Sequence, residues 1–439
     1  MTFMNFLTLE KDYLQVLKEW RRDFHKFPEP GWLEFRTSAI IAEKLRTWGY
    51  DVYVGKEIVN GISLGVPNQS LEQAFYQKAV QSNVSSKWLE KMEAGKTGVI
   101  ATFDTGIEGP TIAYRVDIDA LPILESADED HMPEKLNFRS ENEGFMHACG
   151  HDSHATIGLG LAQQLMERKV MLRGKFIIIF QPAEEGVRGG SAIVSSPLLE
   201  NIDYLFALHI GTGVPKGTFV AGVDGFLATS KFDVTIKGVA AHSGINAERG
   251  KNALLASAQA TLALHSLPPH SEGVARVNVG TLQAGSGRNI IPSLAKMELE
   301  IRGETTAIHD FYEKRVQEIF NGIRAMYDVD IQVEKVGYAL NIPSDQKLAK
   351  TLKETAKFQS AIHEIVEYKE FNSGSEDATF LMKHVQEQGG LACYSIIGTT
   401  LAADHHHEKF DIEEDDMLAA LEIWLNVPFK IYEEMKENG

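Results

Sequence analysis

The chain has 439 residues, which exceeds one ordinary domain and predicts about two or three. Its formal net charge of −18 argues against nucleic acid and anionic membranes as partners, because like charges repel over long range. The two cysteines cannot form a disulfide framework, no apolar run reaches the roughly 18 residues of a membrane helix, and no signal-peptide pattern is visible at the start. We therefore expect a cytoplasmic protein.

The first hundred residues are predicted to be mainly helical. Residues 1–50 carry an apolar helical face that is interrupted at Pro28–Gly31, which indicates two helices. Residues 59–97 are polar and helical, and they look like an insertion between strands. Ser70 and Gln73 have the spacing of a capping box, which predicts a helix start there.

Strands are predicted on both sides of this insertion. Residues 51–54 form a short strand, and residues 97–104 and 111–117 are expected to pair with each other across a Gly-containing turn. After residue 150 strands and helices alternate, beginning with a helix over residues 153–170. Two later strands are apolar on both faces, which indicates a sheet covered by helices on both sides; they are residues 175–180 and 203–210.

Residues 226–337 have a different pattern and are predicted to form an inserted domain. Their elements follow the order β-α-β-β-α-β, which is typical of a compact two-layer α+β unit. In its first strand, alternation places Phe232, Val234 and Ile236 on one buried face.

The remaining residues, 1–225 and 338–439, are predicted to form one α/β domain. Its last helix is expected to begin at Asp411, because Glu414 follows three residues later in a capping-box pattern. The predicted fold is therefore an α/β domain interrupted by a smaller α+β domain.

Metal-binding side chains occur near the ends of several predicted strands. Cys149 and His151 are two residues apart, and Gly150 between them permits a turn that faces both toward one ion, although a buried cysteine and a core histidine would give the same pattern. Glu184 and Glu185 directly follow an apolar strand. In a loop at a strand end, adjacent carboxylates repel each other unless a cation or a proton lies between them.

Further histidines complete this pattern. His209 ends a strand, and residues 405–407 are three consecutive histidines in the loop before the last helix. Each could be structural or solvated when taken alone, but together the strand ends supply nitrogen, oxygen and sulfur ligands for one or two divalent ions. Asp117 and Asp119 end another strand; they are either turn residues, or one of them orients His151 from behind.

Nine sequence motifs point to one protein family. They are "RRDFHKFPEPGWLEFRT", "RVDIDALPI", "MHACGHDSHATIGLG", "FQPAEEG", "LHIGTGVPKG", "AAHSG", "GRNIIP", "GSEDAT" and "HHHEKFDIEE". Through these motifs the chain resembles the M20 metallopeptidase family, in its amidohydrolase branch, over nearly its whole length. The resemblance implies a zinc-peptidase-like mixed sheet flanked by helices, with the inserted domain acting as a lid and dimerisation domain.

The resemblance also implies a metal site. It places two divalent ions on a set of ligands in which Cys149 takes the position of a bridging aspartate in other branches. The spacing to Phe410 selects His406 over His405, although the proline usual in that interval is absent. Ligand softness favours zinc, whereas the resemblance to aminobenzoyl-glutamate and auxin-conjugate hydrolases favours manganese. The implied ligands are Cys149, His151, Glu185, His209 and His406.

The implied activity is hydrolysis of the amide bond of an N-acyl amino acid. The most specific expectation is p-aminobenzoyl-glutamate; the alternative is a broader N-acyl-amino-acid hydrolase or a dipeptidase. By resemblance Glu184 is the general acid and base, His242 stabilises the oxyanion, often across a dimer interface, and Asn289 binds substrate. Arg302 lies on an alternating strand and could bind the substrate carboxylate or be solvated.

The expected partners are a second copy of the chain, docked through the inserted domain, and a related but different second chain. Two hypotheses compete with this reading: a structural metal protein without turnover, and a cysteine hydrolase that uses Cys149. Glu184 argues against the first, since a structural site needs no base. A pocket for glutamate requires additional cations, and the candidates near the lid motifs are Lys231, Arg249, Lys251 and Arg288.

Overall fold

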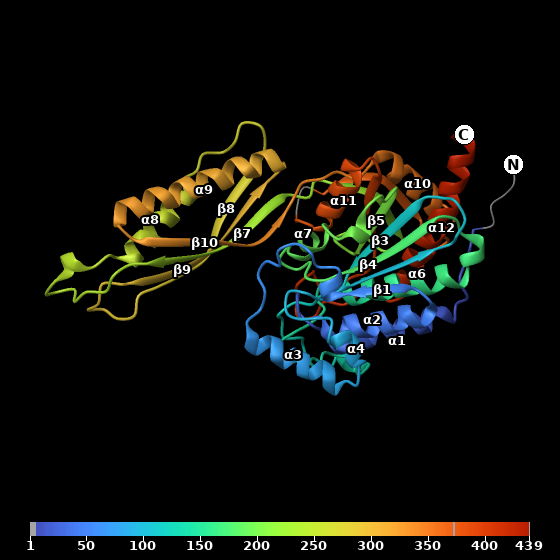
Figure 1. Ribbon diagram of the computed structural model, residues 1–439, viewed down its shortest axis with the longest axis horizontal. Coiled ribbons are helices and arrows are strands. Elements are labelled where there is room, and N and C mark those ends of the chain that lie inside the picture. The colour runs from blue at the N-terminus through green and yellow to red at the C-terminus, as the bar shows by residue number, and fades with distance from the viewer. Residues whose placement is uncertain (1–5, 372–373, 439) are drawn as a thin grey trace.

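A computed structural model describes residues 6–371 and 374–438 (Figure 1). Its larger part is built on an eight-stranded mixed sheet in the order β1-β2-β4-β3-β5-β12-β6-β11. The four neighbouring strands β4, β3, β5 and β12 are mutually parallel, so their carboxyl ends meet at one edge. The strands are β1 Asp51–Val54, β2 Val99–Asp104, β3 Thr111–Asp117, β4 Lys175–Gln181, β5 Tyr204–Ile210, β6 Thr218–Asp224, β11 Glu364–Glu370 and β12 Leu391–Ile397.

Helices cover both faces of this sheet, as the apolar strands predicted. One face packs against five helices, and the other packs against α7 and α11. Hydrophobic burial on both faces explains why β4 and β5 contain almost only apolar side chains. The helices of the first face are α1 Tyr13–Lys26, α2 Phe35–Trp48, α6 His151–Glu167, α10 Gln346–Ala356 and α12 Asp416–Asn438; those of the second are α7 Gly189–Ile193 and α11 Ala378–Glu387.

The remaining helices of the larger part lie outside these two layers. The predicted break between α1 and α2 is confirmed, and so is the helical insertion between strands at residues 59–97. This insertion and the loop after β3 hold α3 Gln69–Gln81, α4 Ser86–Leu89 and α5 Met132–Lys135. Single 3₁₀ turns occur at Gly55–Glu57, Lys169–Met171 and Pro197–Leu199, and another, at Ala247–Arg249, lies in the segment between β6 and α10.

The predicted pairing of residues 97–104 with 111–117 is wrong. Strand β4 lies between them, antiparallel to β2 and parallel to β3. The loop after β2 crosses the start of β4, where the N–H of Thr105 donates to the carbonyl of Gly174 over 3.1 Å. A turn signal shows that the chain reverses, but it does not show which strand the returning segment will join.

Two predicted helix starts also differ from the structure. Helix α3 begins at Gln69, and its cap is Asn68, whose side chain accepts the N–H of Leu71; Ser70 lies inside the helix. The last helix begins at Asp416 because Asp411 has another partner, the buried guanidinium of Arg21. A polar residue can cap a helix only where no stronger partner holds its side chain.

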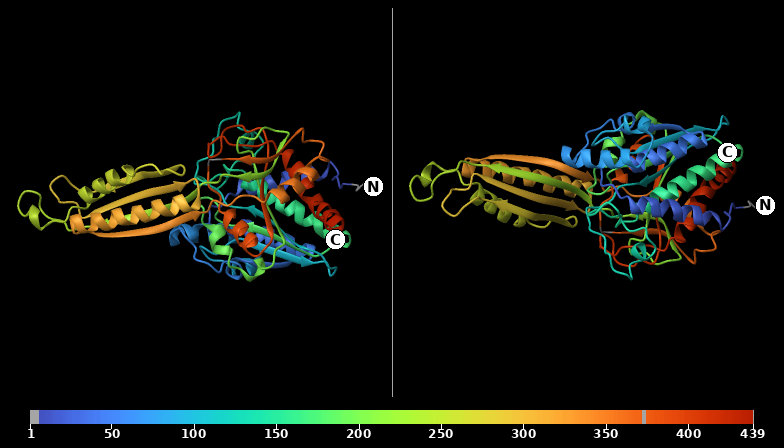
Figure 2. Two further views of the ribbon diagram at one scale, coloured as in Figure 1. Left: turned by 90° about the horizontal axis from the view of Figure 1, so that it is seen from above. Right: turned by 90° about the horizontal axis from the view of Figure 1, so that it is seen from below.

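The segment between β6 and α10 forms a separate four-stranded antiparallel sheet in the order β10-β7-β9-β8 (Figure 1). The order β-α-β-β-α-β is as predicted, and Phe232, Val234 and Ile236 are buried against the helices. Figure 2 shows the two helices on one face and the strands on the other. The elements of this segment are β7 Ala228–Lys237, α8 Ala253–His265, β8 Ala275–Ala284, β9 Leu294–Gly303, α9 Thr306–Tyr327 and β10 Asp330–Ala339.

This unit projects from the larger part like an arm, and its two helices lie along the arm (Figures 1 and 2). The predicted α/β fold with a mixed sheet flanked by helices is confirmed. The division into domains at residues 226 and 337 stays a prediction. Within the described ranges, no helix is both long and apolar enough to cross a membrane.

Candidate metal centre and active site

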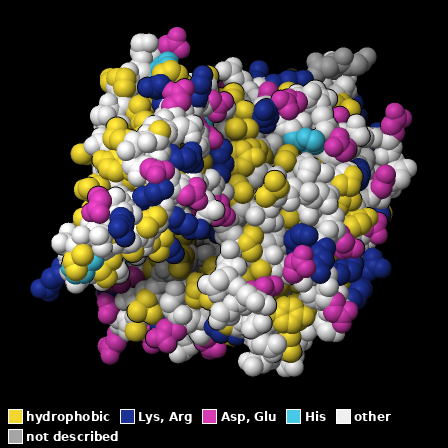
Figure 3. Space-filling model, turned by 60° about the vertical axis from the view of Figure 1, so that its left-hand side comes forward, with side chains coloured by type: hydrophobic (Ala, Val, Ile, Leu, Met, Phe, Trp, Pro, Cys, Tyr) yellow, Lys and Arg dark blue, Asp and Glu magenta, His cyan; other side chains and the backbone are white. Residues whose placement is uncertain are grey.

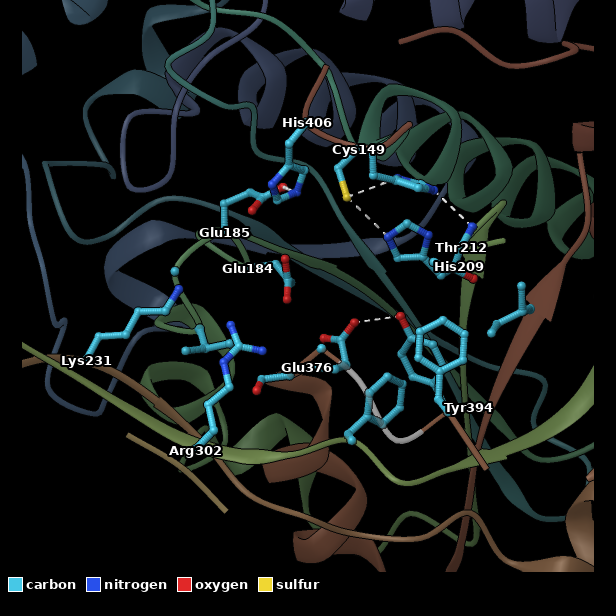
Figure 4. A pocket seen from close by; sticks show the side chains of 18 residues that line it. Cys149, Glu184, Glu185, His209, Thr212, Lys231, Arg302, Glu376, Tyr394 and His406 are labelled. Atoms are coloured by element: carbon cyan, nitrogen blue, oxygen red, sulfur yellow. Dashed lines mark hydrogen bonds and ion pairs between the residues drawn. The ribbon is translucent and has the colours of Figure 1, made fainter. Parts of the chain in front are cut away.

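A pocket of about 340 Å³ opens where the carboxyl ends of the parallel strands face the base of the projecting unit (Figure 4). Loops after β4 and β5, the start of α6 and the loop before α12 supply one side of it. The base of β7 and β9 supplies the other. Ligands of α/β proteins commonly bind at this edge of the sheet, because the chain can place side chains there from several strands at once.

Two groups of potential metal ligands meet in this pocket and share Cys149. One ligand atom each from Cys149, His151 and His209 lie within 4.8 Å of one another, and so do atoms of Cys149, Glu185 and His406. The Sγ atom of Cys149 is 3.5 Å from Nε2 of His209. The structure thus brings together all five residues that the sequence predicted as ligands, with the thiol common to both groups.

The donor atoms of this cluster fit divalent cations. Nε2 of His151 is buried and has no hydrogen-bond partner in the described part of the chain, and the buried Oε1 of Glu185 faces only Nε2 of His406, at 3.4 Å. An unpaired buried polar atom costs about 1–3 kcal/mol, and coordination to a cation would satisfy both atoms. Thiolate, imidazole and carboxylate are established ligands of zinc, and imidazole and carboxylate also suit other divalent metals.

A tight turn sets the position of the first two ligands. Gly150 has a φ of 89° and directly precedes α6, so Cys149 and His151 project to the same side. A Cβ atom at position 150 would lie 2.7 Å from the side chain of Ile210. Both the positive φ and this close approach favour glycine, as the Cys–Gly–His spacing predicted.

Asp119 links the two ligand-bearing loops. Nδ1 of His151 lies 3.0 Å from the carbonyl and 3.2 Å from the carboxylate of Asp119, which leaves Nε2 directed at the centre. The same carboxylate accepts the backbone N–H groups of Glu184 and Glu185 over 3.1 and 3.0 Å. Of the two aspartates considered as a partner for His151, Asp119 contacts Nδ1, and a hydrogen bond of this kind fixes the orientation of a ligand histidine.

Asp117 contacts a different histidine. Its Oδ1 binds Nδ1 of His154 at 2.5 Å, and Nε2 of His154 accepts the backbone N–H of Ile210 over 2.9 Å. The buried guanidinium of Arg115 holds the other oxygen of Asp117 at 2.8 Å. His154 therefore uses both ring nitrogens in supporting the end of β5, next to His209.

His405 and His406 differ in their contacts. Nδ1 of His405 is 3.5 Å from Sγ of Cys149, and its Nε2 accepts the N–H of Thr212 over 2.9 Å, so both nitrogens have partners. His406 has a φ of 65°, which turns its ring toward Glu185, with Nε2 3.4 Å from Oε1. Hydrogen bonds with Cys149 and Glu185 raise the pKa of His406 to about 10. A bound cation would replace this proton.

Glu184 lies beside the ligand cluster and is 9% exposed. Its Oε2 is 4.0 Å from Nε2 of His151. Burial, followed by the charges of Glu376 and Glu185, holds the pKa of Glu184 well above its usual range. A carboxyl group that gains and loses a proton readily is suited to general acid and base chemistry.

A buried network beneath Glu184 was not singled out by sequence reasoning. Arg115 donates to Glu376 and Asp377 over 3.0 and 3.2 Å, and the hydroxyl of Tyr394 donates to Glu376 over 2.5 Å. Both acids belong to the "GSEDAT" motif, which was recognised only as part of the family pattern. A buried arginine within a β-strand, where an apolar residue is expected, was the available signal.

The opposite wall of the pocket has a cationic part and an aromatic part. Lys231 and Arg302 project into it from β7 and β9 (Figure 4). Arg302 therefore lies where a substrate carboxylate could reach it, and its guanidinium is held by Glu300 at 2.6 and 3.1 Å. The apolar side chains that line the pocket are Val187, Phe226, Phe371, Tyr394 and Ile396.

The predicted lid residues His242 and Asn289 lie far from this pocket. They occupy loops at the outer end of the projecting unit, where the N–H of Ser243 donates to the carbonyl of Asn289 over 3.1 Å. Strand β7 separates them from the pocket, and its ten residues span roughly 30 Å. Within one chain these residues do not reach the ligand cluster. Arg249, Lys251 and Arg288 lie in the same outer loops.

Comparison with known proteins gives consistent matches. The family described as "Peptidase family M20/M25/M40" matches residues 113–429. One of the subunits of p-aminobenzoyl-glutamate hydrolase from Escherichia coli (strain K12) is 47% identical over 92% of this chain and 93% of its own length. The indole-3-acetyl-aspartic acid hydrolase of Enterobacter agglomerans is 45% identical over 94% and 95%.

A solved structure agrees with these relatives. The aminobenzoyl-glutamate utilization protein from Klebsiella pneumoniae superposes with a TM-score of 0.81 and 40% identity. The superposition covers 95% of this chain and 96% of that protein, so it includes both the larger sheet and the projecting unit.

Proposed function

The chain belongs to peptidase family M20/M25/M40 and is a hydrolase of that family, as its motifs predicted, and from this premise we propose its substrate and mechanism. The proposed reaction is hydrolysis of the amide bond in p-aminobenzoyl-glutamate, which yields p-aminobenzoate and glutamate. A broader N-acyl-amino-acid hydrolase or a dipeptidase is the alternative within the same chemistry.

The observation that carries this proposal is the shared thiol. Because Cys149 belongs to both ligand groups, it would hold divalent cations together with His151, His209, Glu185 and His406. Manganese and zinc are the proposed ions. When bound, they would activate water and polarise the substrate carbonyl as Lewis acids.

Glu184 is proposed to move the proton. Its carboxylate takes the proton from the attacking water as the new carbon–oxygen bond forms. The same carboxyl group then delivers that proton to the amide nitrogen as the carbon–nitrogen bond breaks, so the amino acid leaves as an amine. The raised pKa of Glu184 supports this second step, because a more basic carboxylate binds the transferred proton more firmly.

The pocket walls support an aromatic acyl group and an acidic amino acid. Phe226, Phe371 and Tyr394 offer apolar surface for an aromatic ring, and Lys231 and Arg302 offer positive charge for carboxylates. The names of the two relatives described above combine these features: an aromatic acyl group joined to glutamate or aspartate.

A homodimer would complete the site. His242 and Asn289 lie at the outer end of the arm, too far to act in their own chain, so we propose that each arm places them in the pocket of a second copy. Figure 3 shows the projecting unit from its outer end, with hydrophobic side chains on its surface. Those exposed on α8 and the outer loops are Val239, Ile245, Leu254, Leu255, Leu262 and Ile290. A related but different second chain is the alternative partner.

A hydrolysis panel tests this function. The purified chain, loaded with manganese or zinc, is assayed with p-aminobenzoyl-glutamate, hippurate and an acetyl amino acid, with and without a related second chain. Hydrolysis that is lost on chelation and restored by added metal supports the proposal. Activity that survives chelation and is abolished by alkylation of Cys149 would support a cysteine hydrolase, and no turnover of any substrate would support a structural role.

A further inference from the structure

The two cations that line the pocket differ in how far they are already neutralised. Arg302 is held by Glu300 through two hydrogen bonds. Lys231 makes no hydrogen bond or ion pair with any residue of the described chain, although Glu300 lies directly opposite it in the register of β7 and β9. The carboxylate of Glu300 thus lies near both side chains and is turned toward the arginine, which leaves Lys231 with only a longer-range attraction to Glu185.

The position of Lys231 exposes this charge to a ligand. Figure 4 shows its side chain extending from the base of the arm toward the side of the pocket that holds Glu184 and Glu185. Figure 3 shows Lys and Arg side chains beside the hollow between the arm and the larger part. When cations occupy the ligand cluster, Glu185 is neutralised by coordination, so an anionic group of the substrate is the remaining counter-charge for Lys231.

The spacing of the Lys231 and Arg302 side chains suits a dicarboxylic amino acid. Arg302 lies two residues beyond Glu300, which places it diagonally across from Lys231 on the same face of the sheet. Diagonal neighbours in an antiparallel pair are about 7–8 Å apart, and long side chains can close that distance. Aspartate and glutamate carry their two carboxylates on a short carbon chain, so both cations can engage one leaving group at the same time.

We propose that Lys231 selects the leaving amino acid by pairing with its side-chain carboxylate, while Arg302 binds the α-carboxylate. The planar fork of arginine matches the carboxylate that all N-acyl amino acids share, and the lysine adds a point charge that only acidic side chains use. This inference rests on the proposed amidohydrolase function and names its leaving-group class: aspartate and glutamate, in preference to neutral amino acids of the same size.

The test compares p-aminobenzoyl-glutamate with p-aminobenzoyl-glutamine, which has nearly the same shape without the charge. Lys231→Met should lower kcat/KM for the glutamate compound about tenfold or more, mainly through KM, and leave the glutamine compound nearly unchanged. Lys231→Arg should retain the preference. Lys237→Met is the matched control. Lys237 is exposed and lies on the same face of β7, six residues nearer the outer end of the projecting unit. Metal content and thermal unfolding confirm that each variant is intact.

A binding measurement tests this inference independently of the proposed function. The dissociation constants of free glutamate and glutamine are measured by calorimetry on the manganese-loaded wild type and on Lys231→Met. Loss of the preference for glutamate in the variant supports the inference even without turnover. A preference that survives in Lys231→Met, or equal losses on both compounds, overturns it while leaving the hydrolase proposal intact. Hydrolysis of neither compound by the metal-loaded wild type overturns the hydrolase proposal itself.

Discussion

The Sγ atom of Cys149 lies 3.5 Å from Nε2 of His209, although the two residues come from different elements and are sixty positions apart. Cys149 is also within 4.8 Å of the ligand atoms of Glu185 and His406. A single sulfur atom therefore joins the two halves of the candidate metal centre, and its replacement should affect both halves at once.

The first prediction concerns this shared position. Cys149→Ala should reduce the bound metal to at most one ion per chain and lower kcat by about a hundredfold or more, because the bridge is lost. Cys149→Asp should keep both ions, since a carboxylate can also bridge. Metal analysis and steady-state assays check both variants. Full metal content in Cys149→Ala would show that the thiol is not a ligand. Cys393→Ala is the control, because Cys393 is buried in the core away from the pocket.

The second prediction concerns proton transfer. Glu184→Gln keeps the size of the side chain and removes its ability to take a proton, so kcat should fall by about 10²–10⁴. Metal content should remain at the wild-type level, because the five proposed ligands are intact. A near-normal rate in this variant would end the assignment of Glu184 as acid and base.

The third prediction concerns stability as a function of pH. Burial alone would lower the pKa of His25, but hydrogen bonds with Asp152 and Glu125 raise it to about 9. A histidine in the unfolded chain titrates near 6.5. The contribution of protonated His25 to the free energy of unfolding is therefore fully present below about pH 6.5 and is lost as the pH rises through 9. The loss should be on the order of 2–3 kcal/mol.

Chemical denaturation of the protein between pH 6 and about 9.5 measures this effect. His25→Gln should be less stable at pH 6 and should show a flatter decline at alkaline pH. An unchanged slope in the variant would mean that His25 is not the group responsible.

The fourth prediction concerns the dimer. His242→Ala and Glu184→Gln should each be nearly inactive alone. When the two are unfolded and refolded together, mixed dimers contain one pocket with an intact Glu184 that faces an arm with an intact His242, so activity should return. Mixtures that remain as inactive as the separate variants would contradict a site shared between chains.

The convergence of the ligand residues could be predicted from the sequence because these residues lie at strand ends. The residues after β4, β5 and β12 could be expected to converge, since the carboxyl ends of parallel strands meet at one edge. The spacing from His406 to Phe410 likewise favoured one of three histidines, and His405 differs from it in accepting the backbone N–H of Thr212.

Other features depend on long-range pairing that a local pattern does not contain. Strand β4, which comes later in the chain, lies between β2 and β3, and the turn after β2 is compatible with either neighbour. The start of α12 shifts to Asp416 because Arg21, nearly 400 positions away, holds Asp411. The same limit applies to Lys231, whose place in the pocket follows from the orientation of the arm.

We propose that sulfur, nitrogen and oxygen donors from distant segments hold two divalent cations beside Glu184. The most direct test is metal analysis of the wild-type protein, purified without chelators, saturated with manganese or zinc and freed of excess ion. We expect two ions per chain. A content below one ion per chain under saturation with either metal would contradict it.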